Sequence, residues 1–287
     1  MLRRNLLVVL ASFALVGCGV SPSAAAVRQA GVAHAASVTL AGGPLMFIGG
    51  GKDQDEIMKA FMELAGGNDQ PVLIFPLASD DPAKSGKAYV DYLGQLGATH
   101  VKFLVPHGEP TAAEAAEVAS SHGMFWSGGD QARIFAALTP GWRAAIAGAW
   151  HHGAVVAGTS AGAMVWGKTA ILGGDPMATA WSGEDPAKDG VQLGAGLGFA
   201  PDLVVDTHFS QRGRVPRLTY AVAKQPGSIG LGVDPETTAI VKPDGSVTVR
   251  GHGTVSLIHV PAQAVKAPMS LRGVRLDMLS AGDTTAL

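Results

Sequence analysis

The chain has 287 residues, of which 47% are hydrophobic and 15% are charged. A chain of this length and apolar content can bury a substantial core, which excludes an intrinsically disordered protein. Lysine and arginine together number 21, against 23 aspartate and glutamate residues. No excess of positive charge is therefore available for the phosphate backbone of a nucleic acid. Beyond the N-terminus, no apolar stretch is long enough to span a bilayer.

Residues 1–17 have the pattern of an export signal, because two arginines precede a short apolar stretch. The stretch ends with Leu15-Val16-Gly17-Cys18, which is similar to the lipobox of bacterial lipoproteins, whose cysteine is acylated. The alternative is an ordinary cleaved signal with an incidental cysteine. We expect a signal peptide over 1–17, a lipidated tether over 18–41 and an exported protein. Its lipid anchor would hold it on the periplasmic or extracellular face of a bacterial membrane.

Cys18 is the only cysteine in the chain. Its position excludes an intramolecular disulfide, and it excludes a cysteine nucleophile or metal ligand in the body of the chain. His151 and His152 are adjacent on a predicted helix and point to different faces, so they make a poor metal site. We expect no metal and no organic cofactor.

From residue 44 onwards, short apolar runs alternate with amphipathic segments, which is the pattern of a parallel α/β sheet. Most of these runs are continuous, as expected for strands buried on both faces. They predict strands over 45–48, 72–75, 101–105, 124–126, 154–157 and 203–205.

Two helices are predicted between these strands. The segment 53–64 carries apolar residues at helical spacing, and 111–119 begins with Thr111 and Glu114 in capping-box register. After residue 228, β-branched runs around Pro243-Asp244-Gly245 predict a C-terminal β-hairpin at the sheet edge. We expect one three-layer α/β domain over 42–287 with a mainly parallel sheet. In such sheets the ligand lies beyond the carboxyl ends of the strands.

The first motif with chemical meaning is Gly158-Thr159-Ser160-Ala161-Gly162, which follows the predicted strand 154–157. A G-x-S-x-G sequence between a strand and a helix predicts a nucleophile elbow that exposes the serine hydroxyl above the sheet. The N–H of Ala161 and the N-terminus of the following helix would face a developing oxyanion. The alternative is a glycine-rich turn whose serine only caps the helix.

Two further signals follow other predicted strands. Gly128-Gly129-Asp130-Gln131 offers Gly129 as a second oxyanion donor, or else a plain turn in which Asp130 caps a helix. His208 follows the run 203–205 and is placed to act as a general base for Ser160. Taken alone, a histidine in this setting is more often a buried core residue, and arginines such as those that follow it are more often a solvated face.

Together, these three segments resemble the cyanophycinases within the dipeptidase E-like serine peptidases. The likeness covers residues 44–287 and includes the late segments 232–234 and 281–283. It implies a fold like that of the class I glutamine amidotransferases and flavodoxins. It also implies a Ser–His–acid mechanism, and hydrolysis of cyanophycin, an aspartate polymer carrying arginine on its side chains, to β-Asp-Arg dipeptides.

The resemblance also implies roles for individual residues. Ser160 is the nucleophile and His208 the base, and a group of polar residues binds the substrate: Gln131, Asp206, Arg212, Arg214 and Arg217. For Arg217 the alternative is a structural salt bridge, because Val215-Pro216 can turn its side chain towards the protein. The chain departs from the family at Thr207, where the cyanophycinases have a glutamine, and we expect this position to affect recognition of the polymer. The acid of the triad is Asp175, at a separation from the serine similar to that in dipeptidase E, or Glu184 in the same loop.

Other functions stay open at this point. The chain could be a dipeptidase for Asp-X or isoaspartyl peptides, or a binding lipoprotein that keeps the pocket without turnover. An amidotransferase is disfavoured because that chemistry uses a cysteine nucleophile, whereas Ser160 occupies the elbow. The expected partners are a peptide or the cyanophycin polymer and a membrane lipid anchor. Whether the enzyme is a homodimer is left open.

Overall fold

The fold of the described residues is built on two β-sheets that pack against each other. The computed structural model describes residues 38–52, 54–174, 190–263 and 270–287. Residues 36–287 group into one unit, apart from residues 1–35. The predicted signal peptide and almost all of the predicted tether lie outside the described residues, so both stay predictions. Among the described residues, no helix has the length and apolar character needed to cross a bilayer.

The first sheet has eight strands in the order β14-β11-β10-β1-β5-β4-β2-β3. Five neighbouring strands of this sheet run parallel to one another, in the order β1-β5-β4-β2-β3. They are β1 (Leu45–Ile48), β2 (Val72–Phe75), β3 (Val101–Phe103), β4 (Gly123–Trp126) and β5 (Val155–Thr159). The other three pair antiparallel, and they are β10 (Thr237–Val241), β11 (Ser246–Gly251) and β14 (Thr284–Ala286).

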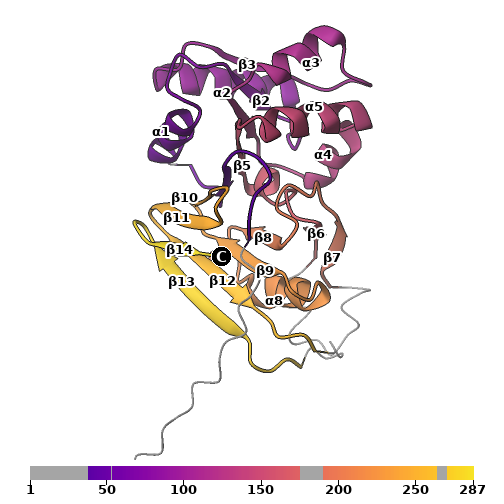
Figure 1. The fold of residues 1–287 in the computed structure, drawn as a ribbon, viewed down its shortest axis with the longest axis vertical. Helices are drawn as coiled ribbons and strands as arrows, with labels where there is room; N and C mark the ends of the chain where they lie inside the picture. The colour runs from indigo at the N-terminus through magenta and orange to yellow at the C-terminus, as the bar shows by residue number, and fades with distance from the viewer. Residues whose placement is uncertain (1–37, 53, 175–189, 264–269) are drawn as a thin grey trace, which may run out of the picture. The chain divides into compact units, whose positions relative to one another are not determined.

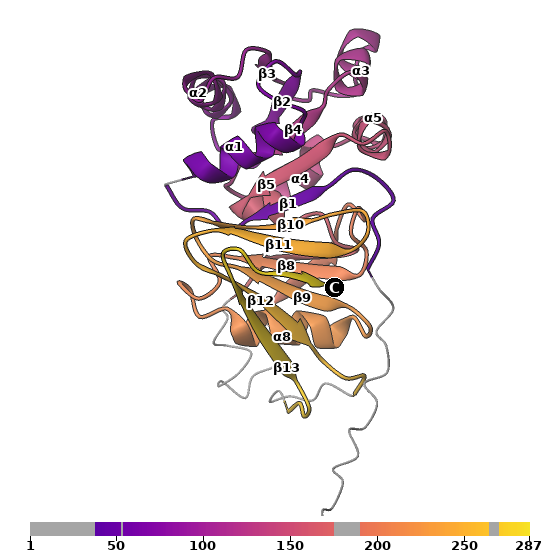
Figure 2. The ribbon, with the colours of Figure 1, turned by 60° about the vertical axis from the view of Figure 1, so that its left-hand side comes forward.

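Helices cover both faces of the parallel strands (Figure 2). One face carries α1 (Asp55–Leu64) and α2 (Pro82–Gln95). The other carries α3 (Ala112–Ala119), α4 (Gln131–Ala137) and α5 (Pro140–His151). Alternate strand residues serve the two faces, since Met46 packs with the α1 side and Phe47 with the α5 side. The sequence therefore predicted this three-layer α/β arrangement correctly.

The starts of two helices show how local sequence sets their boundaries. The capping box of α3 is confirmed, because the Thr111 hydroxyl accepts from the Glu114 N–H at 3.2 Å and the Glu114 carboxylate accepts from the Thr111 N–H at 2.8 Å. The helix predicted over 53–64 begins instead at Asp55, with Gln54 as its N-cap. The Gln54 amide donates to the Gly51 carbonyl at 2.7 Å, which holds the preceding residues in a loop.

The second sheet has four strands in the order β13-β12-β9-β8. These are β8 (Leu203–Thr207), β9 (Ile229–Val233), β12 (Thr254–His259) and β13 (Arg275–Ser280). The helix α8 (Val215–Lys224) joins β8 to its parallel neighbour β9 and covers one face of this sheet (Figure 1). A separate antiparallel pair consists of β6 (Thr169–Gly173) and β7 (Gln192–Ala195).

The position of β8 differs from the single parallel sheet that the sequence predicted. β1 pairs on one side with β5 and on the other with β10, and β5 pairs with β4, so the neighbouring positions in the first sheet are filled. β8 pairs with β9 instead, and its inner face packs against the first sheet in one shared core. An apolar run shows that a strand is buried, but it does not show which strand pairs with it.

Trp126 lies at the centre of this shared core. Its side chain has no exposed surface. Its ring stacks on Phe75, with centroids 5.0 Å apart, and meets the Trp166 ring edge-on at 4.8 Å. Its indole N–H has no hydrogen-bond partner among the described residues. The side chain therefore contributes packing rather than polar contacts.

We predict that Trp126→Ala lowers the free energy of unfolding by about 3–5 kcal/mol, because it leaves a large cavity in a rigid core. Trp126→Phe keeps an aromatic ring and loses no hydrogen bond, so its cost should stay below about 2 kcal/mol. Urea unfolding followed by fluorescence of the remaining tryptophans measures both values. Equal costs for the two variants would contradict this account.

Candidate active site

Ser160 lies at a sharp turn directly after β5. Its φ angle is 52°, in the left-handed region that side chains other than glycine rarely adopt. The strand is buried throughout, whereas Ser160 itself is partly exposed. This combination of a buried strand, a strained serine and a turn is the geometry of a nucleophile elbow.

The glycines around Ser160 allow its close packing. A Cβ added to Gly158 would overlap the Gly162 carbonyl, and one added to Gly162 would overlap the end of β4. The turn continues as one 3₁₀ turn, η1 (Ser160–Ala163), and not as the α-helix that the sequence predicted. Trp166 turns into the core and Gly167 bridges to Ala200, which ends the helix early. A long helix dipole therefore does not act on Ser160.

His208 meets Ser160 from the second sheet. The residue follows β8 directly, and its Nε2 lies 3.1 Å from the Ser160 Oγ. Its φ angle is 46°, so it too has left-handed backbone. Its N–H donates to the Gly49 carbonyl at 2.9 Å, and its ring lies so close to Gly50 that an added Cβ would overlap it. The loop after β1 therefore holds the imidazole over the serine.

Gln211 contacts the other side of the imidazole. Its Oε1 lies 2.9 Å from the Nδ1 of His208. An amide oxygen only accepts hydrogen bonds, so Nδ1 carries the proton and Nε2 of the neutral ring is free to accept from Ser160. The sequence analysis missed this residue. Its spacing of three from His208, in a turn, was the available signal.

Burial lowers the pKa of His208 below its ordinary value of 6.5. The hydrogen bond with Gln211 opposes this effect, whereas the positive charges of Arg212 and Arg214 add to it. His208 is therefore neutral near pH 7, as a general base must be.

Asp206 and Arg217 form a buried ion pair beneath His208. Arg217 donates from Nε to one Asp206 oxygen at 2.7 Å and from Nη2 to the other at 2.6 Å. Its Nη1 donates to the Gly174 carbonyl at 3.1 Å. Asp206 has no exposed surface and Arg217 only 4%. In this arrangement the pair fixes the end of β8, and Arg217 forms the structural salt bridge that the sequence left open as the alternative to substrate binding.

Arg214 extends the same network. It donates to Asp206 at 3.1 Å and to the Thr207 carbonyl. Its Nε is buried and has no partner in the part of the chain that the structure describes. Burial lowers its pKa to about 10, which leaves it charged at neutral pH. Thr207 is fully buried, with its hydroxyl 3.3 Å from the Met164 sulfur. Arg212 is exposed, and within the described residues its side chain has no hydrogen bond or ion pair.

The loop after β4 lies beside the nucleophile. A Cβ added to Gly128 would lie 3.1 Å from the Ser160 Cβ. Gly129 has a φ of 142° and packs on the Ala78 backbone, and Asp130 caps α4 by accepting from the Ala132 N–H at 2.9 Å. Gln131 donates to the Ile171 carbonyl at 2.7 Å, which ties this loop to β6.

Asp234, in the segment that the family resemblance included, supports the His208 loop. Its carboxylate accepts from the Ser210 N–H at 2.8 Å and from the Thr254 hydroxyl at 2.7 Å. Burial alone would raise its pKa, but these hydrogen bonds outweigh burial, and the pKa is lowered. The carboxylate therefore stays ionised and anchors the residues that follow His208.

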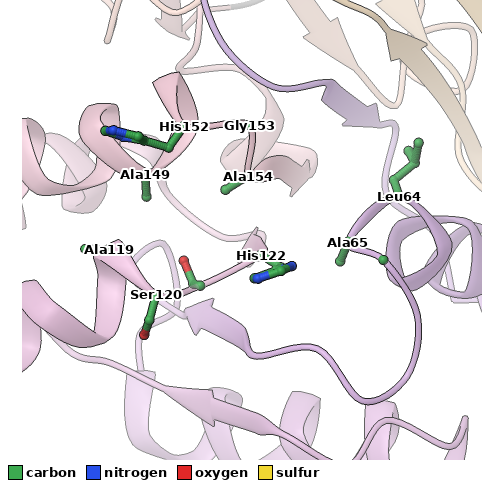
Figure 3. A pocket seen from close by; sticks show the side chains of 11 residues that line it. Leu64, Ala65, Ala119, Ser120, His122, Ala149, His152, Gly153 and Ala154 are labelled. Atoms are coloured by element: carbon green, nitrogen blue, oxygen red, sulfur yellow. The ribbon is translucent and has the colours of Figure 1, made fainter.

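A cavity of about 350 Å³ lies elsewhere, at the amino ends of β4 and β5 (Figure 3). His122, Ala154 and the C-terminal ends of three helices line it. Ser160 lies at the carboxyl end of β5, so this cavity is not part of the site. Across the described ranges, no group of histidine, cysteine and acidic residues is arranged to hold a metal ion.

Asp175 and Glu184, the two candidates for the triad acid, lie outside the described residues. The choice between them therefore stays a prediction. So does the lipidation of Cys18, which also lies outside them.

A serine at an elbow, hydrogen-bonded to a neutral imidazole, is the geometry of a serine-type hydrolase. The model of peptidase family S51 matches residues 45–250, which include Ser160 and His208. The chain belongs to this family of serine peptidases.

Curated relatives and solved structures agree with this assignment. The cyanophycinase of Synechococcus elongatus is 35% identical over 261 residues, which cover 84% of this chain and 78% of the relative. The cyanophycinase of Trichormus variabilis is 34% identical over 256 residues, covering 83% and 84%. The crystal structure of a peptidase from an acI-B1 actinobacterium shares the fold, with a TM-score of 0.61 and 21% identity. The structural match covers 86% of this chain and 97% of the actinobacterial chain.

We predict that the acid limb of the pH profile of kcat/KM has its midpoint below 6.5, because His208 must be neutral and its pKa is lowered. Arg212→Gln removes a nearby positive charge, so the His208 pKa should rise and the midpoint should move up by a few tenths of a unit at low salt. Arg250→Gln, which removes a charge that does not act on His208, is the matched control. A midpoint that moves equally in both variants would contradict the assignment.

Proposed function

We propose that this peptidase hydrolyses cyanophycin to β-Asp-Arg dipeptides through an acyl-enzyme. The observation that carries the catalytic part is the 3.1 Å contact between the Ser160 hydroxyl and His208 Nε2. The identity to cyanophycinases over more than four-fifths of the chain supports the choice of substrate.

In the proposed first step, His208 Nε2 takes the proton of Ser160 as Oγ attacks the scissile carbonyl carbon. The N–H groups of Gly129 and Ala161 are the proposed donors to the oxyanion, since Ala161 directly follows the serine and Gly129 directly follows Gly128, which lies against it. His208 then gives its proton to the leaving amine, and the serine ester remains. Water deprotonated by the same imidazole hydrolyses the ester and restores Ser160.

Substrate binding is proposed for the residues that keep polar groups available near the site. Arg212 is exposed and has no ion pair with any residue that the structure describes, and its guanidinium suits a substrate carboxylate. Arg214 and Gln131 are partly exposed at the same end of the strands. Asp206 and Arg217 are proposed to position His208 through their buried ion pair. The buried Thr207 would act on the polymer only through β8.

The finer fold class is also part of the proposal. The order β3-β2-β4-β5 corresponds to the 2-1-3-4 order of flavodoxin-like sheets, as in the class I glutamine amidotransferase-like fold. The order reverses between β2 and β4. The loops after these two strands pack on each other at Ala78 and Gly129, beside Ser160. β10 and β11, which pair antiparallel around residues 242–245, are the proposed counterpart of the C-terminal hairpin.

We predict that Ser160→Ala abolishes the release of β-Asp-Arg from cyanophycin, lowering kcat by at least about 10³-fold, because the nucleophile is lost. The fold should survive, since only one hydroxyl is removed. The wild type and the variant are each purified and incubated with cyanophycin, and mass spectrometry of the soluble products measures the release of β-Asp-Arg by each. Release of β-Asp-Arg by the variant at a rate near that of the wild type would exclude the serine mechanism.

The same experiment separates the competing functions. Cleavage of Asp-X or isoaspartyl dipeptides without attack on the polymer would identify a dipeptidase. Binding of the polymer with no turnover, and no labelling of Ser160 by a fluorophosphonate, would identify a binding lipoprotein.

Export and lipid anchoring through Cys18 are proposed on the motif at residues 15–18 alone. We predict that the native protein partitions into the membrane fraction with an acylated Cys18 at its N-terminus, and that Cys18→Ser releases it. Intact-mass measurement checks this prediction. An unmodified N-terminus downstream of residue 18 would contradict it. The oligomeric state stays open.

A further inference from the structure

A second pocket lies beside the active site, on the far side of the loop after β1. It has a volume of about 280 Å³ and is lined by Gly51, Lys52, Gln54, Ala88, Tyr89 and Tyr92. We call it the Lys52 pocket. Its size is at the low end for ligand sites, so it suits one unit of a larger ligand.

The loop connects this pocket to the catalytic base. Gly51 lines the pocket, and the preceding Gly50 lies against the His208 ring. Gly50 and Gly51 are consecutive residues, with Cα atoms about 3.8 Å apart, so the pocket begins one residue away from the position that contacts the catalytic imidazole. The Gly50 carbonyl accepts from the Glu236 N–H at 2.7 Å, which fixes the loop between the two places.

The lining groups are chemically mixed. Lys52 is exposed, and its ammonium group has no hydrogen bond or ion pair within the described residues. The Tyr92 hydroxyl donates to the Asp55 carboxylate at 2.6 Å, which brings a negative charge to the ring on α2. Burial raises the pKa of Tyr89 to about 12, so its hydroxyl stays protonated. The pocket thus combines the Lys52 ammonium with the rings of Tyr89 and Tyr92, of which Tyr89 also packs on Phe125. Two carboxylates lie at its edge, that of Asp55 and that of Glu236, which accepts from the Lys52 backbone N–H at 3.4 Å.

We propose that the Lys52 pocket is a subsite for a neighbouring β-Asp-Arg unit of the polymer. This inference rests on the proposed function, in which every unit carries one free carboxylate and one guanidinium. Lys52 binds the carboxylate of the unit. The guanidinium lies on a tyrosine ring, on the side facing Asp55. Binding in this pocket therefore gives longer chains a higher affinity than chains of only two β-Asp-Arg units.

The test uses the Ser160→Ala full domain, so that ligands bind without being cleaved. Calorimetry measures its affinity for oligomers of two and of four β-Asp-Arg units. We expect four units to bind more tightly than two, and we expect Lys52→Glu to reduce this advantage at least fivefold. Lys52→Arg should retain most of it. Lys59→Glu, at an exposed lysine on α1, is the matched control and should leave the advantage intact.

Two results would overturn the subsite. One is that, with Lys52 intact, four units bind no more tightly than two. The other is that Lys52→Glu loses the same factor of affinity for both oligomers. If Lys52→Glu fails to fold, Lys52→Gln makes the same comparison. The proposed function is tested separately, by incubating the enzyme that retains Ser160 with cyanophycin. A polymer left uncut would reject that function, while the affinity ratio still reports on the pocket.

Discussion

The contact between Ser160 and His208 joins two different sheets, and the site depends on how those sheets pack. Ser160 follows β5 in the eight-stranded sheet, and His208 follows β8 in the four-stranded sheet. The inner faces of the two sheets share one hydrophobic core. A relative shift of about 1 Å between them would break the 3.1 Å hydrogen bond. Core packing far from the serine therefore sets the geometry of the reaction.

Backbone strain is concentrated around this contact. Within the described residues, only Ser160, His208 and Glu236 have positive φ without being glycine. Each such residue costs on the order of 1–3 kcal/mol and persists only where surrounding contacts hold it. Here the contacts are the glycine loop after β1, which bonds to His208 and Glu236, and the buried Asp206–Arg217 pair. The most rigid polar network in the site thus supports the base.

The sequence predicted the local features that depend on neighbouring residues. The strands 45–48 and 72–75 have the predicted bounds, the capping box at Thr111 forms, and Ser160 lies at a turn. Sequence alone did not place β8 in its own sheet, because an apolar run does not identify its pairing partner. It also did not show that Asp206 and Arg217 bond to each other. Whether a charged side chain faces solvent or a buried partner depends on contacts between distant segments.

The two halves of the site are also separated along the chain. The elbow is complete by residue 163, whereas the strand that pairs with β8 comes from residues 229–233, and β1 is flanked by residues 237–241. A nascent chain therefore carries the nucleophile well before the imidazole can reach it. A chain that ends before residue 229 keeps the elbow but lacks the strand that pairs with β8, so we expect it to hold the serine without a positioned base.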